Sequence, residues 1–141
     1  MLFRSRAARE AIDTGAKRPL LVAVTVLTSH AQADIEQVGI GGQLAARVDA
    51  LAALAHDAGL DGVVCSPKEA KRLRGRFGEG FVLVTPGIRP RRLSADDQAR
   101  TMSPGEALAQ GASYLVIGRP ITGAVDPLRA LAEINLELTR A

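Results

Sequence analysis

The chain alternates between short apolar runs and longer segments in which apolar residues recur at helical spacing. The apolar runs stand at 20–26, 61–65, 81–85 and 113–117. Short runs of this kind, rich in valine, are typical of strands that are buried on both faces of a parallel sheet. We therefore predict four strands at these positions.

The segments with helical spacing predict helices before, between and after these strands. One helix is expected at 3–14, and another at 44–58, where apolar residues lie on one face and Gly59 provides the stop. A final helix is expected from the capping residue Asp126 to about Thr139.

Two further helices are predicted from a shared start, Ser-Pro-x-Glu. Serine can cap a helix, proline suits the first turn, and a glutamate three residues after the serine completes a capping box. The first of these helices is expected from Ser66 to Phe77, and the second begins at Ser103 and stops at Gly111. A long loop at 86–102 precedes the second helix.

Regular alternation of strands and helices favours a parallel sheet with right-handed crossovers in an α/β fold. Either a small doubly wound sheet or part of a (β/α)8 TIM barrel fits this order. A whole barrel takes about 250 residues. The chain of 141 residues is therefore expected to be a single partial domain, 1–141, with half the units of a barrel.

Composition narrows the class of protein. Hydrophobic residues make up 47% of the chain and charged residues 23%, which is ordinary for a globular protein. No apolar run approaches the roughly 20 residues that span a bilayer, and one tyrosine and three phenylalanines offer little for stacking nucleic-acid bases. The single cysteine, Cys65, fits a reducing compartment. We expect a cytoplasmic protein with no membrane and no nucleic-acid partner.

Candidate binding residues follow the last two strands. In both architectures, ligands bind at the carboxyl ends of the strands. Gly87 and Arg89 follow the third strand, and Gly118 and Arg119 follow the fourth. Glycine lets a ligand approach the backbone, and arginine donates two hydrogen bonds to phosphate oxygens. One such loop alone is best explained as a surface turn, but two on successive strands favour a phosphate site.

Three other features give weaker signals. Thr28 follows the first strand and could bond a base edge, although a simple turn residue is the favoured interpretation. Gln98 lies in the 86–102 loop, which is long enough for a lid or for an irregular excursion. The basic residues at 68–76 are expected to form one solvated helical face.

The residues show no complete catalytic or metal-binding set. His30 and His56 lack the spacing of metal ligands, and no motif for a phosphate-bearing cofactor occurs. None of the three lysines, Lys17, Lys68 and Lys71, ends a predicted strand, where acid–base chemistry would need it. The residues alone therefore predict binding of a phosphorylated small molecule, without an obvious catalyst.

Six segments, in order along nearly the whole chain, closely resemble the bacterial orotidine 5′-phosphate decarboxylases. TPGIRP together with VIGRPIT is the most specific part of the match. The segments are LLVAVTVLTS (20–29), GLDGVVCSPKEA (59–70), LVTPGIRP (83–90), DDQAR (96–100), MSPGEAL (102–108) and YLVIGRPIT (114–122).

The resemblance implies a (β/α)8 barrel, of which this chain holds strands five to eight, and a homodimer that converts orotidine 5′-monophosphate to UMP without a cofactor. It implies that Thr28 contacts the nucleotide near the base and that Gln98 is a lid residue reaching phosphate and pyrimidine. Arg89, Gly118 and Arg119 are implied to grip the phosphate.

The family's catalytic Asp-x-Lys-x-x-Asp segment, which the resemblance places on the third strand, occurs nowhere in this chain. We therefore expect the nucleotide-binding half of a decarboxylase, inactive alone. The alternatives are a catalytically inactive half-barrel that acts as a binding or assembly module, and a related sugar-phosphate decarboxylase. The expected partner is a second copy, which would pair with the open strand edges, or a missing N-terminal half.

Overall fold

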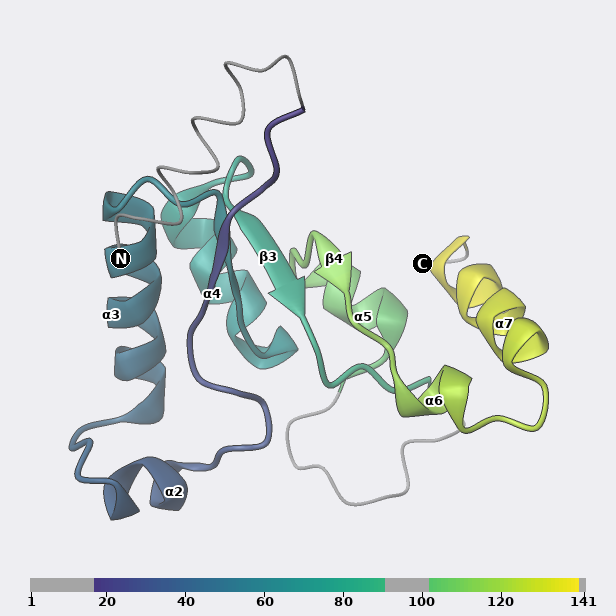
Figure 1. Ribbon diagram of the computed structural model, residues 1–141, viewed down its shortest axis with the longest axis horizontal. Helices are drawn as coiled ribbons and strands as arrows, with labels where there is room; N and C mark the ends of the chain where they lie inside the picture. Colours follow the sequence, from purple (N-terminus) through teal and green to yellow (C-terminus); the bar gives the residue numbers. More distant parts are fainter. Residues whose placement is uncertain (1–16, 91–101, 140–141) are drawn as a thin grey trace.

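The computed structural model describes residues 17–90 and 102–139, so the helix predicted at 3–14 lies outside the described residues. The fold is α/β, with four parallel strands in the order β1-β2-β3-β4 (Figure 1). A doubly wound sheet reverses its strand order at a switch point, whereas a barrel keeps it sequential. The observed order is therefore that of a barrel. The strands are β1 (Val22–Val24), β2 (Gly62–Val64), β3 (Val82–Thr85) and β4 (Tyr114–Leu115).

Helices predicted between and after the strands are confirmed. They are α3 (Leu44–Asp57), α4 (Pro67–Phe77), α5 (Pro104–Ala109) and α7 (Pro127–Thr139).

Both Ser-Pro-x-Glu starts form capping boxes. The Glu69 carboxylate accepts a hydrogen bond from the Ser66 backbone N–H at 2.9 Å, and Glu106 accepts one from Ser103 at 3.1 Å. The reciprocal bonds from the backbone to both serine hydroxyls are also present. Local sequence signals therefore fix where α4 and α5 begin.

Two short helices were not predicted, namely α2 (Gln32–Gln37) and α6 (Arg119–Thr122). The Gln32 side chain joins α2 to the start of α3, because its amide donates to the Gly42 carbonyl at 3.0 Å and its oxygen accepts from the Leu44 N–H at 2.6 Å. In α6, the N–H groups of Ile121 and Thr122 both donate to the Gly118 carbonyl. Neither helix is long enough to show a helical period in the sequence.

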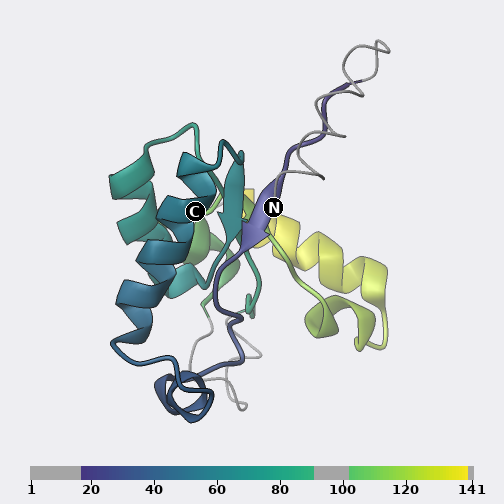
Figure 2. The ribbon, with the colours of Figure 1, turned by 60° about the vertical axis from the view of Figure 1, so that its left-hand side comes forward.

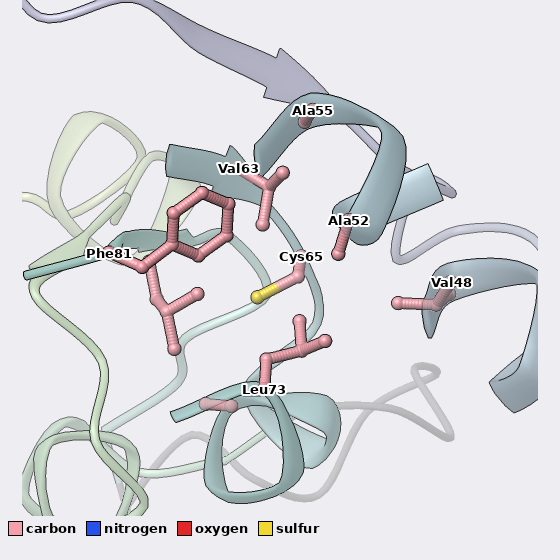
Figure 3. Packing of buried hydrophobic residues seen from close by; sticks show 9 residues of the cluster. Val48, Ala52, Ala55, Val63, Cys65, Leu73 and Phe81 are labelled. Carbon is pink, nitrogen blue, oxygen red and sulfur yellow. The ribbon is translucent and has the colours of Figure 1, made fainter. Parts of the chain in front are cut away.

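The helices α3 and α4 pack against one face of the sheet. Ala23, Val63 and Leu83 are neighbours across β1, β2 and β3, and they belong to the core that lies between the strands and the helices α3 and α4 (Figures 2 and 3). The residues one position further along each strand point to the opposite face. The core cluster comprises Val48, Ala52, Ala55, Val63, Cys65, Ala70, Leu73, Phe81 and Leu83.

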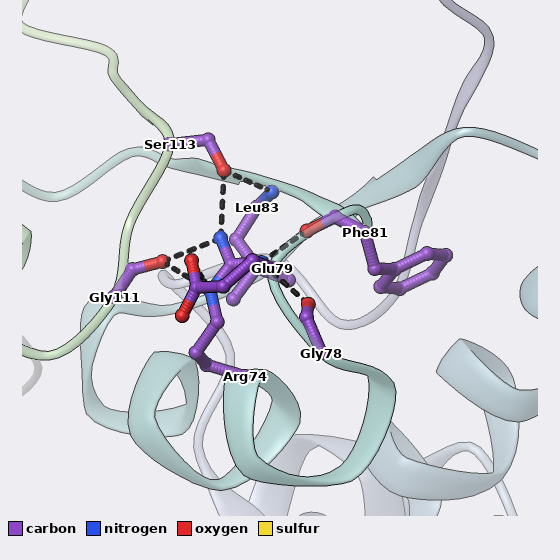
Figure 4. Close-up of polar contacts among 7 residues, drawn as sticks. All are labelled: Arg74, Gly78, Glu79, Phe81, Leu83, Gly111 and Ser113. Atoms are coloured by element: carbon purple, nitrogen blue, oxygen red, sulfur yellow. Dashed lines mark hydrogen bonds and ion pairs between the residues drawn. The ribbon is translucent and has the colours of Figure 1, made fainter.

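The prediction of a solvated basic face on α4 is wrong for Arg74, whose side chain is only 13% exposed. Its guanidinium donates to the carbonyls of Gly78, Phe81 and Gly111 and to the Ser113 hydroxyl, at 2.7 to 3.1 Å (Figure 4). Ser113 in turn accepts from the Leu83 N–H at 3.0 Å. Arg74 therefore joins α4 to the segments that lead into β3 and β4.

Arg72 is also engaged, since its Nε donates to the Asp49 carboxylate at 2.8 Å. This ion pair joins α4 to α3 on the outside of the sheet. The basic residues of α4 thus include two that hold the fold together, rather than forming one free face.

We predict that Arg74→Lys lowers the free energy of unfolding by about 2–3 kcal/mol, because lysine keeps the charge but cannot reach several acceptors with a planar fork. Urea denaturation followed by circular dichroism measures the change. Arg76→Lys is the matched control, because Arg76 is exposed and lies over the ring of Phe77. We expect it to change stability by less than about 0.5 kcal/mol. Equal losses in the two variants would contradict the role assigned to Arg74.

Candidate functional site

The carboxyl ends of all four strands lie at one edge of the sheet, because every neighbouring pair is parallel. Val64 is level with Val84, and Thr85 with Leu115. The pairing continues beyond β4, where the Val116 N–H donates to the Thr85 carbonyl at 2.9 Å. The short helices α2 and α6 lie at this same end of the molecule (Figure 1). This is the edge at which barrels of parallel strands bind ligands.

The loop after β3 has a well-defined backbone up to Arg89. Gly87 has a φ of +80°, in the left-handed region that favours glycine. The Arg89 N–H donates to the Met102 carbonyl at 3.0 Å, and Ile88 forms a β-bridge with Met102. Ile88 itself is fully buried. The two chain segments on either side of 91–101 are thus held together, and the backbone of Arg89 is fixed by this contact.

The loop after β4 begins with Gly118, which caps α6, and Arg119, which is the first residue of that helix. Both residues are exposed. Ile117, immediately before them, packs together with Leu115 and Met102 against the buried cluster that contains Ile88. Because Ile88 precedes Arg89 and Ile117 precedes Gly118, this one apolar cluster brings two loops side by side. We call them the Gly–Arg loops: one holds Gly87 and Arg89, and the other holds Gly118 and Arg119.

Thr28 lies on the same edge but apart from these loops. It stands in a turn after β1, in which the His30 N–H donates to the Leu27 carbonyl at 3.0 Å. β1 is two strand positions from β3 and three from β4, which puts the strands themselves about 10 Å and about 14 Å apart at the usual spacing. Gln98 lies outside the described residues.

Met102 is a residue that the sequence analysis missed. Its carbonyl accepts the bond that fixes Arg89, and its side chain joins the cluster under both loops. The sequence offered one signal for it, namely its position immediately before the capping residue Ser103.

The end of β2 lies between these groups and is occupied by structural residues. Cys65 is 1% exposed. Burial, together with the negative charge of Glu69, raises the pKa of the Cys65 thiol to about 12, against smaller lowering effects of Arg74 and Arg72. A thiol that stays protonated is a poor nucleophile. Cys65 is therefore a core residue, as predicted.

A groove of about 460 Å³ lies elsewhere, between α4 and α5, and its lining includes Lys71, Arg74, Gln110 and Ser113. Ser113 stands at the amino end of β4, so the groove is at the end of the sheet opposite to the Gly–Arg loops. The guanidinium of Arg74, which lines this groove, is already bonded to backbone carbonyls. Residues 17–90 and 102–139 contain no group of three or more metal-ligating side chains, and no helix among them is long and apolar enough to cross a membrane.

Comparison with known proteins gives a consistent match. Residues 4–134 match the sequence profile of the orotidine 5′-phosphate decarboxylase / HUMPS family. The chain is 54% identical over 132 residues to "Orotidine 5′-phosphate decarboxylase" of Alkalilimnicola ehrlichii, covering 94% of this chain and 56% of that protein. It is 52% identical over 135 residues to the protein of the same name from Saccharophagus degradans, covering 96% and 57%. The chain thus spans about half the length of the curated relatives it matches.

A solved structure shows the same likeness. The crystal structure of orotidine 5′-phosphate decarboxylase from Lactobacillus acidophilus superposes with a TM-score of 0.71 at 40% identity, over 88% of this chain and 51% of that one.

The pKa of Cys65 leads to a prediction about alkaline pH. The folded state holds the thiol proton more tightly than the unfolded state, whose cysteine pKa is about 8.5. The resulting stabilisation is fully present below pH 8.5 and is lost as the pH rises toward 12. Between pH 8 and pH 10, we expect the free energy of unfolding to fall by about 2 kcal/mol more in the wild type than in Cys65→Ala. Parallel pH profiles in urea denaturation would contradict the burial of this thiol.

Proposed function

Because the chain belongs to the orotidine 5′-phosphate decarboxylase / HUMPS family, we propose that it supplies the phosphate- and nucleotide-binding half of a decarboxylase that converts orotidine 5′-monophosphate to UMP. Its four strands correspond in this proposal to strands five to eight of a (β/α)8 barrel. The short helix α6, between β4 and α7, supports this assignment. Barrels that bind phosphate often carry a short extra helix near the loops of strands seven and eight.

The observation that carries the proposal is the apolar cluster shared by the two Gly–Arg loops. Ile88 belongs to this cluster and Ile117 packs against it, so Arg89 and Gly118–Arg119 each follow a residue held by the same apolar cluster. Two arginines in adjacent loops at the carboxyl edge of a parallel sheet suit a doubly charged phosphate monoester. In the proposed roles, Arg89 and Arg119 bond the phosphate oxygens, and Gly118 allows the phosphate to approach the backbone.

The remaining nucleotide contacts are assigned to Thr28 and Gln98. β1, which leads to Thr28, lies about 10 Å from β3 along the edge and one strand further from β4, which leaves room for a ribose between phosphate and base. Gln98, which lies outside the described residues, is proposed to reach the phosphate and the pyrimidine from the loop between Arg89 and Met102.

The chemical step needs groups from outside these 141 residues. Loss of CO2 leaves a carbanion on the pyrimidine ring, and a lysine must protonate it, with carboxylates placed against the substrate carboxylate. The Asp-x-Lys-x-x-Asp pattern that provides these groups in the family does not occur in the chain. We propose that this chain binds the nucleotide and that the proton donor comes from another segment.

A sugar-phosphate decarboxylase is the second candidate, since the name of the matching family includes HUMPS proteins. A phosphate site of the same kind would serve either substrate. Curated relatives at 54% and 52% identity are named orotidine 5′-phosphate decarboxylase, which favours the nucleotide.

We predict that the chain binds UMP, weakly, and that Arg89→Ala and Arg119→Ala each weaken binding at least tenfold. Each arginine contributes hydrogen bonds to a charged group, worth about 1.5–3 kcal/mol. Isothermal titration calorimetry measures the affinity. Arg129→Ala is the matched control, because Arg129 is exposed on α7 and bonded to Glu133 at 3.1 Å.

Three variants that bind UMP equally well would contradict the proposed phosphate site. Titration with ribulose 5-phosphate and with uridine separates the two candidate functions. Binding of UMP in preference to both is expected. Preference for the sugar phosphate would favour the second candidate.

A further prediction concerns turnover. The pure 141-residue chain is expected to show no decarboxylation of orotidine 5′-monophosphate above the uncatalysed rate, measured by the change in pyrimidine absorbance. The protein from Alkalilimnicola ehrlichii serves as the positive control. Measurable turnover by the isolated chain would show that its own residues complete the active site, against the proposal.

A further inference from the structure

β4 is the shortest strand of the described sheet, and hydroxyl side chains bond it to β3 at both of its ends. It contains two residues, whereas the other strands contain three or four. At its amino end, the Ser113 hydroxyl accepts a hydrogen bond from the Leu83 N–H at 3.0 Å (Figure 4). At its carboxyl end, the Thr85 hydroxyl donates to the Tyr114 carbonyl at 3.2 Å. The second bond lies where the two Gly–Arg loops leave the sheet.

Thr85 is bonded to β4 through its backbone as well as through its hydroxyl. Its carbonyl accepts a hydrogen bond from the Val116 N–H at 2.9 Å. The two bonds reach β4 on either side of Leu115, which is the register partner of Thr85. Thr85 is fully buried, so water does not compete for these bonds. We call the two bonds, from Thr85 to Tyr114 and to Val116, the Thr85 clamp.

The Thr85 clamp stands at the start of both Gly–Arg loops. Gly87 follows Thr85 by two residues, and Gly118 follows Val116 by two residues. Because the clamp bonds the last paired residues of β3 and β4, it fixes the start of one loop relative to the start of the other. The burial of Thr85 keeps its side chain away from a bound ligand, so its effect on a ligand must pass through the backbone.

We propose that Thr85 is a positioning residue of the phosphate site, which holds the two Gly–Arg loops at the separation that one phosphate group requires. This inference rests on the proposed function. A phosphate held by two loops binds best when both loops are in place before it arrives, because ordering them on binding subtracts from the affinity. The apolar cluster that contains Ile88 brings the loops together, and the Thr85 clamp fixes the strands from which they emerge.

The same kind of bond occurs between β1 and β2, where it serves as a matched control. The Thr25 hydroxyl donates to the Val64 carbonyl at 2.9 Å, and the Thr25 N–H donates to the same carbonyl at 3.1 Å. Neither β1 nor β2 leads into a Gly–Arg loop. Removing the Thr25 hydroxyl therefore takes the same bond from the sheet without changing the contact between β3 and β4.

The first test compares Thr85→Val with Thr25→Val in the 141-residue chain without a ligand. Valine keeps the branched shape of threonine but has no hydroxyl. The informative backbone amides are those of Gly118 and Arg119, which follow the opposite strand. Their chemical shifts are expected to change in Thr85→Val and to stay unchanged in Thr25→Val. Unchanged shifts in Thr85→Val, or equal changes in both variants, would overturn the proposal.

The second test measures the affinity for UMP by isothermal titration calorimetry, with Thr85→Ser as an added variant. Thr85→Val is expected to weaken UMP binding about fivefold, which corresponds to the loss of one hydrogen bond. Thr85→Ser keeps the hydroxyl, and Thr25→Val leaves β3 and β4 unchanged, so both are expected to bind within about twofold of the wild type. Urea denaturation measures the stability of each variant, which separates positioning of the loops from general weakening of the sheet.

The outcomes separate this inference from the proposed function. A wild-type chain that does not bind UMP would overturn the proposed function, and with it the part of Thr85 in binding. A wild-type chain that binds UMP, with Thr85→Val binding equally well, would overturn the part of Thr85 alone. Losses of affinity that follow the losses of stability in both valine variants would also overturn it.

A third measurement uses the wild type and holds even if Thr85→Val does not fold. A ligand whose binding depends on the Thr85 clamp must stabilise the clamp in return. Saturating UMP is therefore expected to slow hydrogen exchange of the Val116 amide, which bonds to Thr85, more than that of the Thr25 amide, which bonds to Val64. Equal slowing of exchange at the two amides would overturn the proposal.

Discussion

The backbone pairing of four parallel strands in sequential order is the constraint on which the rest of the structure depends. Each strand hydrogen-bonds to the next one in the chain, so each connection must cross from the end of one strand to the start of its neighbour. Such crossovers are right-handed in nearly all proteins, which places α3, α4 and α5 on the same face. The same constraint collects every carboxyl end at one edge of the sheet and turns the row of Val24, Val64, Val84 and Tyr114 toward the opposite face.

Side-chain contacts differ between the amino end and the carboxyl end of this sheet. At the amino end, Arg74 satisfies the carbonyls of the segments that enter β3 and β4, and Asp61 accepts bonds from Arg18 and from the Leu21 N–H. These contacts hold the framework. At the carboxyl end, capping boxes and the cluster around Ile88 position the backbone of the loops that hold Gly87, Arg89, Gly118 and Arg119. In the proposed function, the contacts that stabilise the fold are therefore separate from those that would bind the phosphate.

The parts of the fold that were predicted correctly depend on local signals. The bounds of α4 follow from the cap at Ser66 and the stop at Gly78, which are neighbours of that helix in sequence. α2 was missed because it is held by Gln32 bonding to Gly42 and Leu44, and the role of Arg74 was missed because Gly111 lies 37 residues away. The same limit applies to the candidate site. The sequence identifies the strand ends, but the packing of Ile117 against the cluster that contains Ile88 is a tertiary contact, and it places the two loops close together.

The central claim is that the two Gly–Arg loops form a single phosphate site at the edge of the sheet. A titration of the isotope-labelled 141-residue chain with UMP, followed through backbone amide chemical shifts, tests it most directly. The account predicts that the amides of Gly87, Arg89, Gly118 and Arg119 shift together and follow one binding curve. Shifts that appear instead in the groove around Lys71 and Gly111, or in only one of the two loops, would contradict it.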